Sequence, residues 1–201
     1  MHPMLLPRRA GKTVRWLQDC DHQSGASMVE VLVALVVVAI GVLGAAGLFL
    51  LSNRGTVDAS FRTAAAQAAS EMADRVRLNP GGAATYNVNA VIDTSVAIAT
   101  DCYSVACTPV QQANFDRLVW AKSLVDNART EPDRSHYARI PGARAVVCMD
   151  STPNDGSPSA PACDLRANAP WVVKIWWQGR AMTAAEGSGE ITRSFMMSFL
   201  P

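Results

Sequence analysis

Residues 25–51 read GASMVEVLVALVVVAIGVLGAAGLFLL, and this stretch decides the fold class of the 201-residue chain. Its last part, from Val31 to Leu51, contains no charged and no polar side chain. At about 1.5 Å per residue, a helix of this length spans roughly 30 Å, the thickness of the hydrocarbon core of a bilayer. The alternatives are a buried core helix and a cleaved secretory signal, but the apolar core of a signal is usually only about 7–15 residues long. We therefore expect a retained membrane-spanning helix.

The residues before the apolar run predict its orientation. The segment 1–25 carries four basic side chains and two aspartates, the basic ones being Arg8, Arg9, Lys12 and Arg15. Short, positively charged flanks stay in the cytoplasm. The part of the chain after Ser52 is therefore expected in the periplasm, outside the inner membrane.

Glu30 stands directly before the apolar run and is out of place there. An unpaired charge at membrane depth costs about 2.5 kcal/mol or more. One interpretation is a carboxylate that reaches the lipid headgroups. The other is a charge pair, because cleavage after Gly25 would leave a new α-ammonium group on Ala26, close to Glu30 in the sequence. The two charges would then neutralise each other, within one chain or between neighbouring chains.

This stretch resembles the N-terminal motif of type IV pilins and pseudopilins, in which a prepilin peptidase cuts after a glycine and N-methylates the new terminus. The resemblance implies cleavage between Gly25 and Ala26, methylation of Ala26, and a need for Glu30 in filament assembly. The chain departs from the common pattern in having Ala rather than Phe as the first mature residue, and its leader, 1–25, is longer than many. The glycine and the glutamate keep their register.

Further segments are similar to the PilV-type minor pilins, which are type IV pilus modification proteins. They are Ala39–Gly47, Met72–Pro80, and Cys107-Thr108-Pro109 followed by Ala113, Asp116 and Trp120. The resemblance covers residues 25 to about 125. It implies a subunit that is anchored in the inner membrane before assembly, joins other minor pilins and the major pilin, and helps to initiate assembly at the pilus tip. Cell adhesion and twitching motility are the pilus activities that this family implies.

Three glycines, Gly41, Gly44 and Gly47, recur at every third position of the apolar run. A face of small residues lets helices approach closely, which suits packing in a filament core. The alternative is that glycine is simply tolerated in a membrane helix.

The helix is expected to continue to residue 79 as a rod with one apolar side. The apolar residues of this second half are spaced three or four apart, at Phe61, Ala65, Ala68, Met72 and Val76. Asn79-Pro80-Gly81-Gly82 then ends the helix. The predicted parts are a cleaved leader (1–25), the membrane and filament-core half of the helix (26–52), its amphipathic half (53–79) and a periplasmic head (80–201).

The fold class expected is α+β, the type IV pilin fold, in which the long helix packs on a small antiparallel sheet. Thr108 and Gln111 form a capping box, with Pro109 in the first turn, and predict a second helix. Strands are expected near 88–96, at 143–149, at 171–177, where every second residue is strongly apolar, and at 191–200. Trp176 falls on the outward face of the third strand, where it is either a partner contact or covered by other parts of the head.

Cysteine usage fits an oxidising compartment. Cys20 lies in the leader, and four cysteines remain outside it, which is an even number: Cys102, Cys107, Cys148 and Cys163. Of the three pairings that four cysteines allow, we favour Cys102–Cys107 with Cys148–Cys163 because both are local. No metal site is expected, since the spacings are not C-x-x-C and the only histidine after the leader is His136.

Enzymatic chemistry, a cofactor and a small-molecule substrate are not expected. The chain contains no G-x-S-x-G, no G-x-x-x-x-G-K-[ST] and no H-E-x-x-H. Loss of the leader would remove four basic and two acidic side chains from totals of 18 and 17, which leaves the chain close to neutral, so nucleic-acid binding is disfavoured. Four arginines suggest a basic patch and a role in DNA uptake, but acidic residues are interleaved with them: Arg129, Arg134, Arg139 and Arg144. The remaining alternatives are a pseudopilin of a type II secretion system and a membrane-anchored periplasmic binding or adhesion domain.

Overall fold

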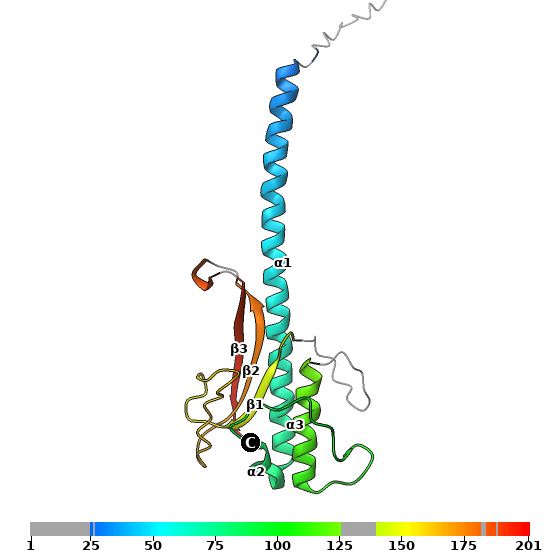
Figure 1. Cartoon of the computed structure of the whole chain (residues 1–201), viewed down its shortest axis with the longest axis vertical. Coiled ribbons are helices and arrows are strands. Elements are labelled where there is room, and N and C mark those ends of the chain that lie inside the picture. Colours follow the sequence, from blue (N-terminus) through cyan, green and yellow to red (C-terminus); the bar gives the residue numbers. More distant parts are fainter. Residues whose placement is uncertain (1–24, 26, 126–139, 182–183, 188) are drawn as a thin grey trace, which may run out of the picture. The chain divides into compact units, whose positions relative to one another are not determined.

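The computed structural model describes residues 25, 27–125, 140–181, 184–187 and 189–201 (Figure 1). The chain divides after Ala45 into two compact units. The first unit is, in its described part, the start of the long helix α1. The second unit contains the rest of α1 and the head.

Helix α1 runs from Met28 to Leu78 without interruption, as predicted. Its buried side chains all belong to the second half of the helix, and five of the seven are alanines: Ala64, Ala65, Ala68, Ala69, Met72, Ala73 and Val76. Four of them are members of the predicted stripe, and Phe61, its fifth member, is partly buried against the same core. Alanine lets a neighbour come close to the helix backbone. The indole of Trp120 uses this space and donates its N–H to the carbonyl oxygen of Ala68 at 2.8 Å.

Two short elements follow α1, the 3-10 helix η1 (Pro80–Gly82) and the helix α2 (Ala83–Tyr86). A Cβ atom at Gly82 would lie 2.6 Å from the carbonyl oxygen of Pro109 and 3.0 Å from the Cβ of Ala113. This close approach between η1 and the helix that begins at Pro109 is why residue 82 must be a glycine.

Helix α3 (Pro109–Val125) begins with the predicted capping box. The backbone N–H of Gln111 donates to the hydroxyl of Thr108 at 3.3 Å, and the Gln111 side-chain oxygen accepts the backbone N–H of Thr108 at 2.9 Å. The two bonds satisfy donors that a helix N-terminus otherwise leaves free.

The sheet has three antiparallel strands in the order β1-β2-β3 (Figure 1): β1 (Arg144–Met149), β2 (Trp171–Arg180) and β3 (Glu190–Phe199). Val147 of β1 lies opposite Val173 of β2, which in turn lies opposite Met197 of β3. The predictions of strands at 143–149, 171–177 and 191–200 are confirmed.

Both faces of β2 are buried, which the alternation alone did not predict. Trp171, Val173, Ile175 and Trp177 pack in the main core with α1 and α3. On the opposite face Val172 and Trp176 pack with Val146 and the cysteines of one disulfide. Trp176 is only 2% exposed, so its interpretation as a partner contact is wrong and coverage by the head is confirmed.

The strand expected near residues 88–96 is not formed, and this prediction is wrong. The segment touches the edge of β1 through two backbone bonds, from Val88 N–H to Val147 O at 3.5 Å and from Ile92 N–H to Ala145 O at 3.0 Å. Directly after the second bond, Asp93 accepts the backbone N–H of Ser95 at 2.9 Å. This local turn bends the chain away from the sheet.

Candidate processing and assembly site

The start of α1 brings Ser27 and Glu30 together. The Ser27 hydroxyl accepts the backbone N–H of Glu30 at 3.2 Å, and its carbonyl accepts the N–H of Val31 at 3.2 Å. Ser27 is thus the residue that caps the helix, with Glu30 in the first turn, where the helix dipole favours a negative charge. The sequence analysis missed this role, although Ser-x-x-Glu before an apolar run is the signature of a capping box.

The first half of α1 leaves its apolar side chains uncovered. Val31, Leu43 and Leu51 are 48%, 74% and 52% exposed. Within the described part of the chain, α1 is the one helix whose length and composition suit a membrane span. An apolar surface of this extent on one helix marks contact with lipid or with other helices.

The predicted packing glycines have no close neighbour in the described part of the chain. A Cβ atom added at Gly41, Gly44 or Gly47 would have no neighbour within 4 Å, and the same is true at Gly25. No internal contact therefore calls for glycine at these positions. Ala26, the predicted new terminus, lies outside the described residues, so its pairing with Glu30 remains a prediction.

At the other end of α1, Asp116 of α3 collects three donors. Its Oδ1 accepts from Arg75 Nη1 at 3.0 Å and from Gln112 Nε2 at 2.8 Å, and its Oδ2 accepts the hydroxyl of Tyr86 at 2.5 Å. Arg75 also pairs with Glu71 on its own helix. The network joins α1, α2 and α3 through one carboxylate that is 4% exposed.

Two groups of this network have shifted pKa values. Burial, and then the hydrogen bond to Asp116, raise the pKa of Tyr86 well above its ordinary value, so the phenol stays protonated and donates. Burial acts to lower the pKa of Arg75, but the hydrogen bond and charge of Glu71 and the charge of Asp116 outweigh it and raise that pKa. Both groups therefore keep the protonation states that the network needs.

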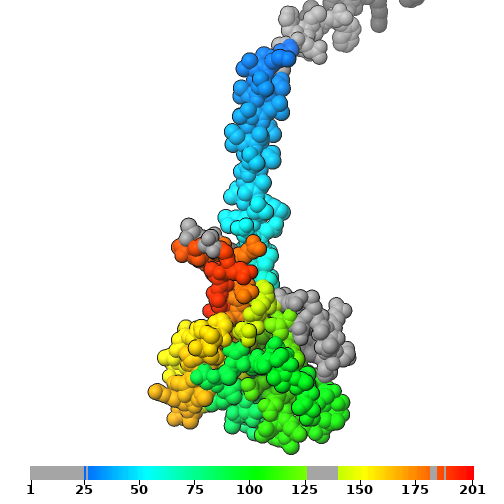
Figure 2. Space-filling view, in the orientation of Figure 1, coloured from blue at the N-terminus to red at the C-terminus, as the bar shows by residue number. Residues whose placement is uncertain are grey.

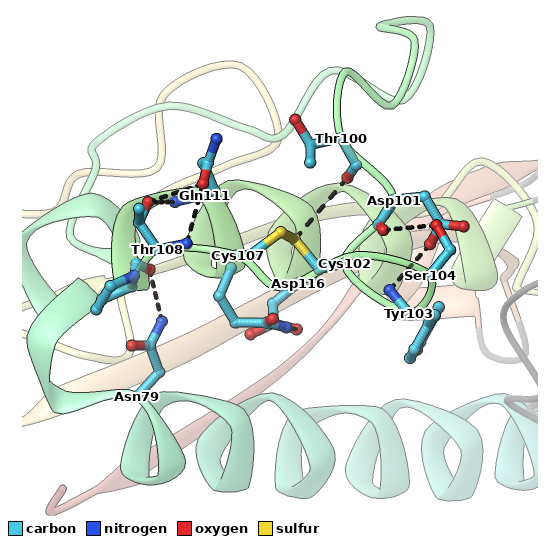
Figure 3. Close-up of a disulfide and its surroundings, with 12 residues drawn as sticks. Asn79, Thr100, Asp101, Cys102, Tyr103, Ser104, Cys107, Thr108, Gln111 and Asp116 are labelled. Carbon is cyan, nitrogen blue, oxygen red and sulfur yellow. Dashed lines mark hydrogen bonds between the residues drawn. A yellow bond between two sulfur atoms is a disulfide. The ribbon is translucent and has the colours of Figure 1, made fainter.

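Two of the three segments that resemble PilV-type pilins, Met72–Pro80 and the start of α3, meet at this junction (Figure 3). Asn79, next to the end of α1, donates its side-chain N–H to the carbonyl of Pro109 at 2.8 Å. Ala113 and Trp120 are fully buried in the core, and Asp116 holds the network described above. In the described structure these residues serve the attachment of α3 to α1.

The structure contains the two local disulfides that the sequence favoured. Cys102–Cys107 closes a short loop before α3 (Figure 3), and Cys148–Cys163 ties the end of β1 to the loop between β1 and β2. Their Cα atoms are 5.6 and 6.2 Å apart.

A buried lysine of β2 contacts the loop that the second disulfide ties down, and the sequence did not predict it. Lys174 of β2 is fully buried and its ammonium group contacts Asp150 at 2.5 Å and Asp155 at 2.8 Å. It also donates to the carbonyl oxygen of Pro161 at 2.9 Å. One cation thus holds the loop between β1 and β2 against the sheet. The signal in the sequence was weak, a single charge within the apolar run of residues 171–177.

Three arginines of the predicted basic patch and His136 fall in residues 126–139, outside the described residues, as do the leader residues 1–24. The fourth arginine, Arg144, is exposed at the start of β1. Within the part of the chain that is described, no three His, Cys, Asp or Glu side chains gather in a way that could hold a metal ion.

Comparison with known families adds two matches. A family model described as type IV pilin Tt1218 matches residues 49–118, and a model of the prokaryotic N-terminal methylation motif matches residues 20–46. No curated protein and no solved structure matches the chain significantly. The apolar helix and the motif suggest membrane anchoring, and the motif implies processing by a prepilin peptidase and assembly with other pilins. The long helix on a three-stranded antiparallel sheet, the two disulfides and the two family matches together support a type IV pilin.

Proposed function

We propose that this chain is a minor pilin of the PilV type. A prepilin peptidase cuts it after Gly25 and methylates Ala26, and residues 31–51 hold it in the inner membrane with the head in the periplasm. It then joins other minor pilins and the major pilin in the complex that initiates pilus assembly.

The observation that carries this proposal is the contrast between the two halves of α1. The second half is bound into the head by a stripe of alanines and by Asp116. Among the residues that the structure describes, the first half finds no partner for its apolar side chains or for its glycines. A helix built in this way suits a subunit that passes from lipid into a bundle of like helices. Similarity of Met72–Pro80 and of the start of α3 to PilV-type pilins supports the minor-pilin role.

Intact mass spectrometry of the chain isolated from its host tests the processing. The expected mass begins at Ala26 and carries one added methyl group. A chain that keeps the segment 1–25 would contradict the proposal and favour a permanently anchored binding or adhesion domain.

Two variants of Glu30 test assembly and separate its two roles. Glutamine is accepted at the third position of a capping box, so Glu30→Gln keeps the helix start and removes the charge, whereas Glu30→Ala changes both. We expect both variants to insert into the membrane normally and to enter sheared filaments about a hundredfold less. Either substitution leaves the ammonium group of Ala26 unpaired, and an unpaired charge at membrane depth costs about 2.5–3.5 kcal/mol. Asp74→Asn, an exposed acid on the same helix, is the control. Normal incorporation of Glu30→Gln would refute the charge pair.

Incorporation of the chain into a secretion pseudopilus, with none in sheared type IV pili, would favour the type II secretion alternative. The genes next to this one are the cheapest first indication of which machine it serves.

A further inference from the structure

A pocket of about 400 Å³ lies in the head between the loop 91–100 and α3. Both segments are green in Figure 2, where this part of the head reaches the surface. The walls are largely apolar, with Ile92, Val96 and Ile98 from the loop and Phe115 and Leu118 from the helix. We call this cavity the α3 pocket. Its volume suits one or two side chains of a ligand.

Arg117 lines the α3 pocket. Its Nη1 donates to the carbonyl oxygen of Thr85 at 3.1 Å, and its buried Nε has no hydrogen-bond partner. Three other cations that are withdrawn from solvent, Arg75, Lys174 and Arg193, each pair with two carboxylates. Lys122, on the same helix as Arg117, donates to the carbonyl oxygen of Thr94 at 2.7 Å. Among the described residues, no carboxylate forms an ion pair with Arg117.

Burial lowers the pKa of Arg117 below its usual value, but a guanidinium stays charged at any physiological pH. A charge half-withdrawn from water without a partner is costly. An anionic group that entered the pocket would remove this cost.

Asp93 also lines the α3 pocket, but its carboxylate is engaged elsewhere. Its Oδ1 accepts the hydroxyl of Ser95 at 2.7 Å in addition to the backbone N–H of the same residue. These bonds hold the pKa of Asp93 below its usual value. The acid is thus fixed within its own turn.

Exposed apolar residues extend the pocket along the surface. Tyr103 is 53% exposed and its ring meets Phe115 edge to face, with the ring centres 4.9 Å apart. Val96, in the pocket wall, and Val105, beside Tyr103, are also about half exposed. The disulfide Cys102–Cys107 fixes the loop that carries Tyr103 and Val105. The apolar surface is therefore larger than a small molecule would need.

We propose that the α3 pocket binds a segment of a partner protein in which an Asp or Glu side chain stands beside an aliphatic or aromatic one. Because Nε is buried, a carboxylate would meet the guanidinium at Nη2 and at the second N–H of Nη1. The apolar walls accept the neighbouring side chain, and the apolar surface around Tyr103 accepts the continuing backbone. This recognition site is independent of the apolar half of α1 and adds a specific protein contact to the proposed pilin.

The probe is the blocked dipeptide acetyl-Asp-Leu-amide, with acetyl-Asn-Leu-amide as its neutral match. The full chain is prepared in detergent micelles with labelled Ile, Leu and Val methyl groups, and its NMR spectrum is followed during titration. We expect saturable shifts of the Ile92, Ile98 and Leu118 methyl groups with the Asp peptide, and about tenfold weaker binding of the Asn peptide. The methyl groups of Ile175, which is buried in the sheet, should not move.

Two variants assign the effect to the guanidinium. Arg117→Gln should lower the affinity for the Asp peptide to that of the Asn peptide, while Arg62→Gln, which removes an exposed arginine of α1, should leave it unchanged. Arg117→Lys keeps the charge without the fork and should fall between them. Unchanged Ile175 signals show that each variant is folded, and if Arg117→Gln fails this check the comparison of Arg117→Lys with the native chain decides.

Three outcomes would overturn the proposal. They are the absence of saturable shifts with the Asp peptide up to about 20 mM, equal affinity for the two peptides, and unchanged binding after both substitutions of Arg117. Phenylacetate is titrated in parallel. Binding of this free carboxylate without any response to the Asp peptide would assign the pocket to small amphiphilic acids and would also overturn it.

Discussion

Replacing Asp116 by alanine would break the junction between α1, α2 and α3 at its central acceptor. The carboxylate is 4% exposed, and it accepts hydrogen bonds from Arg75, Gln112 and Tyr86. Removal of one partner of a buried ion pair costs about 3–5 kcal/mol, and a buried hydroxyl left without an acceptor costs about 1–3 kcal/mol.

The lower end of the range of about 3–5 kcal/mol for the ion pair applies here, for two reasons. Arg75 keeps its pair with Glu71, so its charge is not left alone, and its side chain is 17% exposed, which lets water reach it. We therefore expect Asp116→Ala to lower the free energy of unfolding by about 3 kcal/mol. For a domain of this size that is a fall in Tm of roughly 6–12 °C.

Tryptophan fluorescence during thermal unfolding of the full chain in detergent measures the change, because Trp120 packs against α1 at the same junction. Asp74→Ala is the matched control. It removes another aspartate that pairs with an arginine of α1, Arg77, but this pair is largely exposed and is expected to contribute about 0.5 kcal/mol or less. A loss for Asp116→Ala no larger than that of the control would refute the structural role of the network.

Three further predictions concern the head. Lys174→Met should cost about 3–5 kcal/mol because it leaves the buried Asp150 unpaired, and the double variant with Asp150→Leu should recover part of the loss in the same unfolding assay. Gly82→Ala should cost about 1–3 kcal/mol, since its Cβ would meet a backbone oxygen; Gly81→Ala, which meets only a proline side chain, should cost less. The hydrogen bond from Lys174 lowers the pKa of Asp155 below its ordinary value of 3.8. The ionised carboxylate therefore stabilises the fold above pH 3.8, and this stabilisation is lost as the pH falls through the lowered pKa. The difference in Tm between native chain and Asp155→Asn should therefore shrink between pH 5 and pH 3, and a constant difference would show that the charge is not responsible.

The elements of the fold could be predicted where a single periodicity extended over many residues. The unbroken apolar run and the alanine-rich stripe predicted the extent of α1 closely at both ends, and the Thr108–Gln111 box predicted the start of α3. The segment 88–96 was mispredicted because, among the described residues, its backbone bonds to the sheet edge only through the N–H groups of Val88 and Ile92. Composition alone could not reveal the turn that Asp93 makes between alternating residues.

The burial of β2 on both faces could not be predicted, because alternation describes one face at a time. Lys174 reads as a solvent-facing residue of a half-buried strand. It is buried because two aspartates and a carbonyl from the loop between β1 and β2 supply the partners that water would otherwise give. Those partners are far from Lys174 in the sequence, and only the folded loop, tied down by Cys148–Cys163, brings them to one place.

Glu30 has two physical explanations, and they apply to different states of the protein. In the isolated chain the acid lies in the first turn of α1, capped by Ser27, where the helix dipole offsets part of its cost. That explanation needs no cleavage, and it accounts for an acid beside an apolar run before any partner is present. The dipole effect amounts to about 0.3–1 kcal/mol, however, which is less than the cost of a charge that moves to the centre of an apolar bundle. Under the proposed function, a full compensating charge is needed only in the assembled state. The cap by Ser27 would then stabilise the acid before assembly, and a new ammonium group at Ala26 would do so afterwards.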